Sequence, residues 1–556
     1  MDVFYIADWL VDTNGDYILR NEIKIKLESR VMAVLLYLAQ HPNKIISRTD
    51  LETAVWADTV VGYDALTSSI TKLRKALGDN ARQPIFIETI AKKGYRLIAP
   101  ISISQSPDRR HKNDIEIPHK AIKKRLTPIL VVLFLLLAVA LSVIIIPFNK
   151  DTSIDANLSM LNSKITKPSI AVLPFTDLSH STEKNYFSDG ITADVTTALS
   201  KLSGLLVIAW SSSASYKNQT TSISQVSSAL GVRYVLEGKV RRENKKIRVN
   251  VQLIDANTGQ HIWAERYDRS INDILEVQSD IADKIVSALS IKLTDEEKRL
   301  IAKRYTTSVA AYDDFLKGQS HERTSQEETL IARDLFQTAI DRDPNFARAY
   351  GALALSYVDE FRFRWGVHSK DTLNEALVLS KKAISIDENL PQAYWVLGYV
   401  HLHRMEYKEA VEAIKTATLL DPNNADNYGL LALISVYQNK PETAIKLIRR
   451  AKVLNPHYSA HYPSVLGQAY YSLGQYDKAL PALREAINRN VNLLPPHIYL
   501  VITLSQMGQI EEAQWEAEQI RLIAPEFTVS DISDMFPFSD QTKQQVIMDQ
   551  LHALGY

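Results

Sequence analysis

The sequence predicts a multidomain chain with a small α+β unit at the N-terminus, a single transmembrane helix, a small α/β module and a C-terminal all-α superhelix. Three observations support this order. Alternating and helical patterns of apolar residues fill roughly the first hundred positions, an uncharged run follows from Ile129 to Ile146, and small residues recur about every 34 positions beyond Tyr305. These patterns are typical of strands and helices, a membrane span, and a helical repeat, respectively.

Composition limits the classes of function. The chain has 556 residues, with 64 Lys and Arg residues against 64 Asp and Glu residues, and no cysteine. The length predicts three or four globular units. The lack of cysteine excludes disulfides, thiolate nucleophiles and Cys-ligated zinc. The N-terminus has no basic region followed by an apolar run, so no cleaved signal peptide is expected.

Residues 1–103 are predicted to form one domain. Two alternating stretches, 3–11 and 16–27, flank Asn14-Gly15, a dipeptide typical of hairpins. Three helical patterns follow, with Ser47 as the expected N-cap of the second and Gly78 ending the third. The stretch "PIFIETIAKKGYRLIAP" predicts two strands around a Lys-Lys-Gly turn. Helix, helix, helix, hairpin is the order of a winged helix-turn-helix.

The third helix carries a DNA-facing pattern. Its apolar residues lie on one narrow stripe that must be buried, formed by Leu66, Ile70, Leu73 and Leu77. A rotation of about 100° per residue places the polar side chains outward or on the flanks of that stripe. These are Ser68, Thr71, Lys72 and Lys75 outward, with Thr67 and Arg74 on the flanks. Hydroxyls and long cations suit a helix in the major groove, although the same pattern also fits a solvated helix face.

A resemblance to a known family favours the DNA-facing interpretation of this helix. The run "SSITKLRKALGDN" followed by "IFIETIAKKGYRLIAP", with "SRTDLETAVW" upstream, resembles the OmpR/PhoB-type winged-helix DNA-binding domain over nearly all of residues 2 to 100. The resemblance implies phosphate contacts by Arg48 and Trp56, and a wing that enters the minor groove. Many relatives have Arg where this chain has Ala91, so Lys92 and Lys93 are expected to make the wing contact instead. No receiver domain precedes the first strand, and phosphorelay control is therefore not expected.

Periodicity and resemblance together give one set of candidate DNA-binding residues. The set consists of Arg48, Trp56, Thr67, Ser68, Thr71, Lys72, Arg74, Lys75, Lys92, Lys93 and Arg96. The expected ligand is double-stranded promoter DNA.

The apolar run predicts a membrane span over 127–147, since about 20 such residues cross a hydrocarbon core of about 30 Å. A buried core helix is the alternative, but core helices rarely stay apolar on every side. The linker before it, 104–126, is richer in Lys and Arg than the linker after it, 148–167. The positive-inside rule then predicts a single-pass protein with a cytoplasmic N-terminus and an exported C-terminal region. The resemblance described next implies that the membrane is the bacterial inner membrane and that the exported region is periplasmic.

The order of DNA-binding domain, linker and span resembles the CadC/ToxR-type membrane-anchored activators. In those proteins an outer domain senses a signal and the inner domain binds promoters, without a kinase between them. Some members use an outer disulfide, which this chain cannot form because it has no cysteine.

Residues 168–295 are predicted to form a small α/β module. Strand and helix patterns alternate at first, and a three-stranded meander and a last helix follow. The stretch "ALGVRYVLEGKVRR…VQLIDANTGQHIWAERYDR" resembles the TolB/FlgO-like module that precedes tetratricopeptide repeats in many bacterial regulators. Asp177, Asp189 and Asp194 stand near strand and helix ends, with His180 nearby; solvated capping roles are favoured over a ligand site.

Residues 305–556 are predicted to form a tetratricopeptide superhelix of about six helix pairs. Ala332, Ala376, Ala410, Ala444, Ala479 and Ala513 are separated by 44, 34, 34, 35 and 34 residues, and Ala339, Ala383, Ala417, Ala451 and Ala486 keep the same step. Such a superhelix has a concave face that binds a protein or peptide partner. His457 and His461 stand at i, i+4, a spacing that can hold zinc, but no third ligand is evident and surface polar residues are favoured.

The leading hypothesis is a membrane-anchored one-component transcriptional regulator. Its repeat-containing region perceives a signal or partner, and its winged helix binds promoter DNA as a homodimer on tandem half-sites. RNA polymerase is a further candidate partner. The alternative is an envelope scaffold that assembles partners through its repeats. An enzyme is disfavoured because no nucleophile with a base, phosphate loop or metal set is evident, so no catalytic residue, cofactor or metal is predicted.

Overall fold

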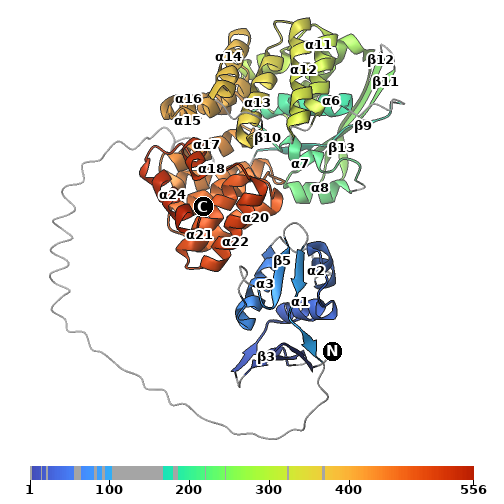
Figure 1. The fold of residues 1–556 in the computed structure, drawn as a ribbon. Coiled ribbons are helices and arrows are strands. Elements are labelled where there is room, and N and C mark those ends of the chain that lie inside the picture. Colours follow the sequence, from blue (N-terminus) through green and yellow to red (C-terminus); the bar gives the residue numbers. More distant parts are fainter. Residues whose placement is uncertain are drawn as a thin grey trace, which may run out of the picture. The chain divides into compact units, whose positions relative to one another are not determined.

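The computed structural model describes residues 3–13, 15–20, 23–55, 64–79, 84–90, 94–102, 167–179, 186–219, 221–243, 246–321, 325–365 and 370–556. The chain divides into two compact units, Met1–Thr166 and Lys167–Tyr556 (Figure 1). They are called unit 1 and unit 2 below, and each is described by itself.

Unit 1 has the predicted order of sheet, helices and hairpin. Each of the two predicted N-terminal strands is divided into two short strands, and the first division is at Ala7, whose φ is +50°. The resulting sheet has the order β4-β3-β2-β1-β7, and the wing is a separate antiparallel pair, β5 with β6. The elements are β1 (Val3–Ile6), β2 (Trp9–Asp12), β3 (Tyr17–Arg20), β4 (Ile23–Lys26), α1 (Ser29–Gln40), α2 (Arg48–Val55), α3 (Asp64–Leu77), β5 (Ile87–Ile90), β6 (Gly94–Leu97) and β7 (Ile101–Ser102).

The core of unit 1 explains why α3 is held with one face inward. The predicted stripe is confirmed, because Leu66, Leu73 and Leu77 are 0% exposed and Ile70 is 2% exposed. These side chains pack with Val34, Leu35 and Leu38 of α1 and with the sheet. Burying four such side chains contributes on the order of 6 to 12 kcal/mol of hydrophobic free energy. This stripe therefore fixes which face of α3 is turned away from the core.

Unit 2 begins with a mixed sheet of order β10-β8-β11-β12-β13, with β9 paired to β11. The neighbours β10, β8 and β11 run parallel, and β11, β12 and β13 form the predicted antiparallel meander. The elements are β8 (Ser169–Val172), β9 (Thr176–Asp177), α6 (Tyr186–Ser200), β10 (Leu206–Val207), α7 (Trp210–Ala214), α8 (Ile223–Leu230), β11 (Tyr234–Glu243), β12 (Lys246–Asp255), β13 (Gln260–Ser270), η1 (Ile271–Asp273), α9 (Ile274–Ala288) and α10 (Asp295–Ala302).

The rest of unit 2 is the predicted stack of helix pairs, which runs from yellow to red in Figure 1. The eleven predicted repeat alanines are all 0% exposed, so the small residues stand where paired helices touch. The helices are α11 (Val309–Ser320), α12 (Gln326–Arg342), α13 (Ala347–Phe363), α14 (Lys370–Ile386), α15 (Pro391–His403), α16 (Tyr407–Leu420), α17 (Ala425–Tyr437), α18 (Pro441–Leu454), α19 (His461–Ser472), α20 (Tyr476–Arg489), α21 (Leu494–Gln506), α22 (Ile510–Ile523), η2 (Val529–Asp531), α23 (Ile532–Met535) and α24 (Thr542–Ala553).

The α/β module and the repeats share one continuous core rather than forming separate domains. The turns between repeats hold the module by polar contacts. Asn423 donates from its amide to the carbonyls of Ser200, Leu202 and Leu205 at 2.9 to 3.1 Å. One turn further along, Asn455 accepts from Ser212 Oγ at 2.5 Å. The predicted boundary between 295 and 305 thus falls inside one compact unit.

The prediction of a transmembrane helix is corrected. Among the residues that the structure describes, no helix is both long enough and apolar enough to cross a bilayer. A span needs about 20 apolar residues, whereas the longest described helices, α12, α13 and α14, have 17 residues and carry charged side chains. The predicted span, 127–147, lies outside the described residues, as do 104–126 and 148–166. The fold class is therefore stated without a membrane helix, and the single-pass inner-membrane localisation is withdrawn with it.

Candidate nucleic-acid interface and repeat cavity

Helix α3 is positioned by a capped helix that precedes it. Ser47 accepts a hydrogen bond from the N–H of Asp50 at 3.1 Å and donates from Oγ to the Asp50 carboxylate at 2.7 Å. This satisfies a free N–H in the first turn of α2 and confirms the predicted N-cap. The hydrophobic side chains of α2 and α3, including Leu51 and Leu66, enter the core of unit 1.

Lys72 lies on the outward face of α3. Its ammonium donates to both carboxylate oxygens of Glu28, at 2.8 and 2.9 Å, while the two side chains stay 50% and 68% exposed. An ion pair in that setting contributes about 0 to 1 kcal/mol. The Lys72 ammonium is therefore exposed and only weakly held by Glu28, and its contact with DNA stays a prediction.

Arg74 has a different environment from the one that periodicity predicted. It is 7% exposed, and its Nη2 donates to the carbonyl of Ile87 at 2.8 Å and to Thr89 Oγ1 at 2.9 Å. Burial lowers the pKa of this guanidinium, and nearby Asp79 and Tyr95 oppose that effect. Arg74 thus ties α3 to the wing hairpin. Its contact with DNA stays a prediction.

Arg96 lies on β6 of the wing and faces β5. It donates to the Glu88 carboxylate at 2.9 Å from Nε and at 2.5 Å from Nη2. Gly94 begins this strand with a φ of +127°, and a Cβ there would overlap the carbonyl of Ile46. The lack of a side chain lets Tyr95 exchange both backbone hydrogen bonds with Ile46, at 2.9 and 3.0 Å. The wing is thereby anchored to the segment that precedes α2.

The remaining candidates are placed only in part. Arg48 is the first residue of α2, and four further candidates belong to α3, but nothing is described of their side chains; the four are Thr67, Ser68, Thr71 and Lys75. Trp56, Lys92 and Lys93 lie outside the described residues. Their roles in DNA binding stay predictions.

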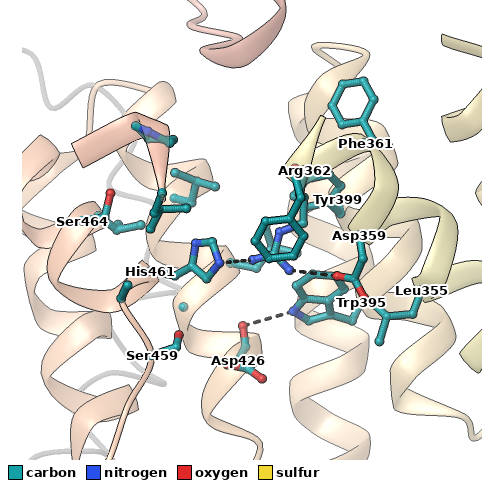
Figure 2. Close-up of a pocket in the computed structure, with 18 of the residues that line it drawn as sticks. Leu355, Asp359, Phe361, Arg362, Trp395, Tyr399, Asp426, Ser459, His461 and Ser464 are labelled. Carbon is teal, nitrogen blue, oxygen red and sulfur yellow. Dashed lines mark hydrogen bonds and ion pairs between the residues drawn. The ribbon is translucent and has the colours of Figure 1, made fainter. Parts of the chain in front are cut away.

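A second candidate site is a cavity of about 1170 Å³ inside the repeat array, called the repeat cavity below. It is lined mainly by the first helices of successive pairs, α13, α15, α17 and α19. Figure 2 shows Arg362 of α13 between these walls, near Trp395 and Tyr399 of α15 and His461 of α19. The rings of Trp395 and Tyr399 stack with centroids 5.7 Å apart. The cavity therefore combines flat apolar walls with a cation.

Arg362 links two walls of this cavity, α13 and α19, by a hydrogen bond. Its Nη2 donates to His461 Nε2 at 2.8 Å, and its Nη1 lies 3.5 Å from Asp359 Oδ1. Burial and the neighbouring Arg362 lower the pKa of His461 well below its usual value, so its ring is neutral and can accept a hydrogen bond at Nε2. Residues of the first and fourth of these helices, 99 positions apart in the chain, thus meet.

The three aspartates of the module do not form a cluster. Asp177 caps its own turn by accepting from the N–H of Ser179 at 2.7 Å, in agreement with a capping role. Asp189 pairs with Lys217 at 2.5 Å. Asp194 is buried, and a solvated role is wrong for it, because it accepts from Arg348 at 2.6 Å and from Tyr312 Oη at 2.6 Å. His180 lies outside the described residues.

The two histidines of "NPHYSAHY" do not share a helical face. His461 begins α19, whereas His457 lies before it and contacts Ser215 Oγ at 2.8 Å. His457 is exposed as predicted, whereas His461 is only partly exposed, because it lies against Arg362 at the wall of the repeat cavity. Among the described residues, no group of three or more acidic or histidine side chains could hold a metal ion.

Sequence reasoning did not single out Arg362, Trp395, Arg348 or His461 as a group. They come from three helices, α13, α15 and α19, and Arg362, Trp395 and His461 meet only through the curvature of the repeats. The one local signal is that Trp395 and Tyr399 stand at i, i+4 on a helix with buried small residues on its other side. Such pairs on the first helix of a repeat are expected to face the concave side.

The fold and the sites define a class: a winged-helix domain of the transcriptional-regulator type, joined in one chain to an α/β module and a tetratricopeptide array. Residues 21–97 match the family described as transcriptional regulatory protein, C terminal. Residues 165–288 match the second domain of HilA/YgeH-like transcriptional regulators, which covers the stretch compared above with TolB/FlgO-like modules. Residues 391–424 and 430–495 match tetratricopeptide repeats.

Two of three relatives similar to this chain are named as transcriptional activators, and the third is named as a cyclase. The transcriptional activator CadC of Escherichia coli is 24% identical over 410 residues, which are 67% of this chain and 76% of CadC. The cholera toxin transcriptional activator of Vibrio cholerae is 42% identical over 79 residues, 14% of this chain and 27% of that protein. A protein named putative adenylate cyclase 3 of Rhizobium meliloti is 43% identical over 233 residues, 42% of this chain and 40% of that protein. The chain is therefore similar to CadC/ToxR-type activators, as the motifs predicted.

The extent of these matches differs widely. The chain spans well under half the length of the cyclase-named protein and of the Vibrio cholerae activator. What those proteins do as wholes thus informs a proposal for this chain rather than an assignment.

Proposed function

We propose that this chain regulates transcription by binding promoter DNA through unit 1, in response to a ligand or protein partner bound by unit 2. The observation that carries the proposal is the division of α3 into a fully buried stripe and an outward face that includes the exposed Lys72. The match of residues 21–97 to transcriptional regulatory proteins supports it. No catalytic activity is proposed.

In this proposal, α3 reads the DNA bases, and cations of α2, α3 and the wing bind the DNA phosphates. Thr67, Ser68 and Thr71 of α3 face base edges, since hydroxyls reach donors and acceptors in the major groove. The cations fix the domain on the phosphates without reading sequence. The proposed contacts to the DNA phosphates are Arg48, Trp56, Lys72, Lys75, Lys92, Lys93 and Arg96. Arg74 acts by holding the wing against α3, which sets the angle between the two DNA-contacting elements.

Half-site pairing is part of the proposal. Helix-turn-helix domains bind half-sites about one helical turn apart, so two copies of the chain would occupy one promoter. RNA polymerase is the partner that a promoter-bound activator would contact.

Binding of residues 1–105 to DNA tests the proposal directly, because unit 1 is compact and has its own core. Fluorescence anisotropy is measured on fragments selected from a genomic library. Lys72→Ala is expected to weaken binding to all sequences and to reduce the slope of log K against log salt by about one. Thr71→Ala is expected to relax discrimination between bases at one position, by about 1 to 3 kcal/mol.

Lys24→Ala is the matched control, since Lys24 is an exposed cation on the N-terminal sheet. It should leave affinity and salt slope unchanged. Sequence-independent binding that none of the three substitutions alters would contradict the proposal. It would favour the alternative of a scaffold, in which the repeats assemble partners and deletion of residues 1–103 leaves transcription unaltered.

A further inference from the structure

The Arg362 guanidinium has weaker hydrogen-bond acceptors in the repeat cavity than a carboxylate in direct contact would provide. Arg362 donates to a neutral imidazole and lies 3.5 Å from its nearest described carboxylate oxygen, on Asp359. Charge-assisted hydrogen bonds to a carboxylate are shorter and about twice as strong as those to a neutral acceptor. An anion inside the cavity would therefore compete well with His461 for Arg362.

Two other arginines of the lining leave donors unused. Arg364 pairs with Asp531 at 2.9 Å through Nη2, but its Nη1 has no hydrogen-bond partner among the described residues. Arg348 lies fourteen residues before Arg362 on α13, about 21 Å away along the helix. It pairs with Asp194 through Nη2, and its Nη1 is unpartnered within the described residues. A buried donor without an acceptor is costly, so these groups favour an occupant that supplies acceptors.

Three of the five carboxylates of the lining, Asp359, Asp421 and Asp426, have described donors, and the other two, Glu526 and Asp534, are exposed. Asp426 accepts from Tyr462 Oη at 2.8 Å, and Asp359 lies beside Arg362. Asp421 accepts from Ser200 on one oxygen and leaves Oδ1 without a described donor, but this group faces the α/β module and the cation of Lys201. Beside Arg362, the unmet demand is thus for negative charge.

The aromatic side chains that line the cavity indicate the shape of the rest of the ligand. Trp395 and Tyr399 offer stacked rings, and Phe363 lies beside Arg362 with its ring centre 5.7 Å from the guanidinium carbon. A volume of about 1170 Å³ is on the scale of small-molecule pockets, which hold up to about 1,000 Å³. Figure 2 shows Arg362, His461 and the two rings of α15 converging on one space.

We infer that the repeat cavity binds a small organic anion with a flat aromatic or apolar body, whose acid group takes the place of His461 on Arg362. Binding would then break the contact between α13 and α19 and change the curvature of the array. That this occupant is the signal for unit 1 depends on the proposed function; that it binds does not.

Calorimetric titration of the full chain tests the inference with charge-reversed probes. Benzoate and naphthalene-2-carboxylate carry the expected acid on a flat body, benzylamine carries a cation on the same body, and inorganic phosphate has no apolar body. Both carboxylates are expected to bind, phosphate more weakly, and benzylamine not at all. No binding of either carboxylate at millimolar concentration, or tighter binding of benzylamine, would overturn the inference.

Three variants distinguish loss of a ligand contact at Arg362 from a general change in the fold. Arg362→Gln should weaken carboxylate binding about tenfold or more, because it removes a charge-assisted pair. His461→Phe should retain or tighten binding, since it removes the competing acceptor; weaker binding of an intact fold by this variant would overturn the displacement step. Arg248→Gln, at an exposed cation of β12, should change nothing. DNA binding by residues 1–105 is measured separately, so its failure and the failure of this inference are distinguishable.

Discussion

Each unit has an ion pair between a cation and a carboxylate, but the pair in unit 1 is exposed and the pair in unit 2 is buried. In unit 1, Lys72 and Glu28 pair in the open, with side chains 50% and 68% exposed. In unit 2, Arg348 and Asp194 pair at 2.6 Å with side chains 9% and 3% exposed, between the first repeats and the α/β module. The exposed pair can be separated at small cost, whereas the buried pair cannot be separated without leaving a charge in the core. The comparison teaches that burial of the pair, rather than residue type, decides how easily the cation can leave its partner.

Arg348→Met should give the largest effect. It leaves Asp194 buried without its cation, and breaking a buried pair in this way costs about 3 to 5 kcal/mol of folding free energy. Urea unfolding of residues 167–556 measures it. Arg248→Met is the control, because that arginine pairs with Asp268 on an exposed strand and should cost less than about 1 kcal/mol. Equal losses of folding free energy in both variants would mean that burial does not make the Arg348–Asp194 pair more important for stability than the exposed pair.

Asp421 should make unit 2 less stable as the pH rises. Burial raises the pKa of Asp421 to about 6, from a usual value of 3.8. Because the folded state prefers the protonated acid, this stabilising contribution is complete below about pH 4 and is lost as the pH rises through about 6. The difference between the two pKa values corresponds to about 3 kcal/mol of folding free energy.

Asp421→Asn is neutral at every pH and isolates this group. The stability of the variant relative to the native chain should rise by up to about 3 kcal/mol between pH 4 and pH 8, measured by urea unfolding. Asp268→Asn is a control with the opposite sign, since Arg248 and Arg266 lower the pKa of that carboxylate. A relative stability of Asp421→Asn that stays flat with pH would show that Asp421 ionises freely.

Gly94→Ala should destabilise unit 1 by about 2 to 3 kcal/mol, because a Cβ at φ +127° meets the Ile46 backbone. Thermal unfolding of residues 1–105 is the measurement. Gly78→Ala is the matched control: its φ is also positive, +71°, but its Cβ would meet nothing closer than Arg20 at 3.9 Å. It should cost about 1 kcal/mol. Equal costs would mean that the anchoring of the wing at Ile46 is not tight.

Lys72→Ala should give the smallest change in stability, within about 0.5 kcal/mol, because its pair with Glu28 is exposed. Its effect on DNA affinity should nevertheless be clear. Thermal unfolding and anisotropy on the same preparation of residues 1–105 separate the two. A loss of stability as large as that of Gly94→Ala would place Lys72 among the structural cations and weaken the comparison.

Local patterns predicted the elements that depend on local contacts. The Leu66 stripe of α3, the Ser47 cap and the eleven repeat alanines are all where periodicity placed them, because each depends on neighbours within a few turns. Arg74 was predicted on a flank of the outward surface, yet its long side chain reaches Ile87 and Thr89 on the wing. Periodicity gives the direction of a Cβ but not the end point of a long side chain.

Contacts between distant segments were not predictable in the same way. Asp194 and Arg348 are 154 positions apart, and Arg362 and His461 are 99 apart, so no local pattern links them. They form because the repeats curve and because the turns between repeats hold the α/β module. The apolar run at 129–146 led to a membrane helix that the described residues do not contain. That prediction came from hydropathy, to which the flanking charges and the resemblance to membrane-anchored activators were added.

Mapping the genomic DNA bound by the full chain in living cells tests the central claim most directly. The native chain is compared with a variant that carries Thr71→Ala and Lys72→Ala, at equal protein levels. The account predicts discrete sites that share a motif of two half-sites about one helical turn apart, and their loss in the variant. Binding that is absent, or uniform along the genome and unchanged in the variant, would contradict it.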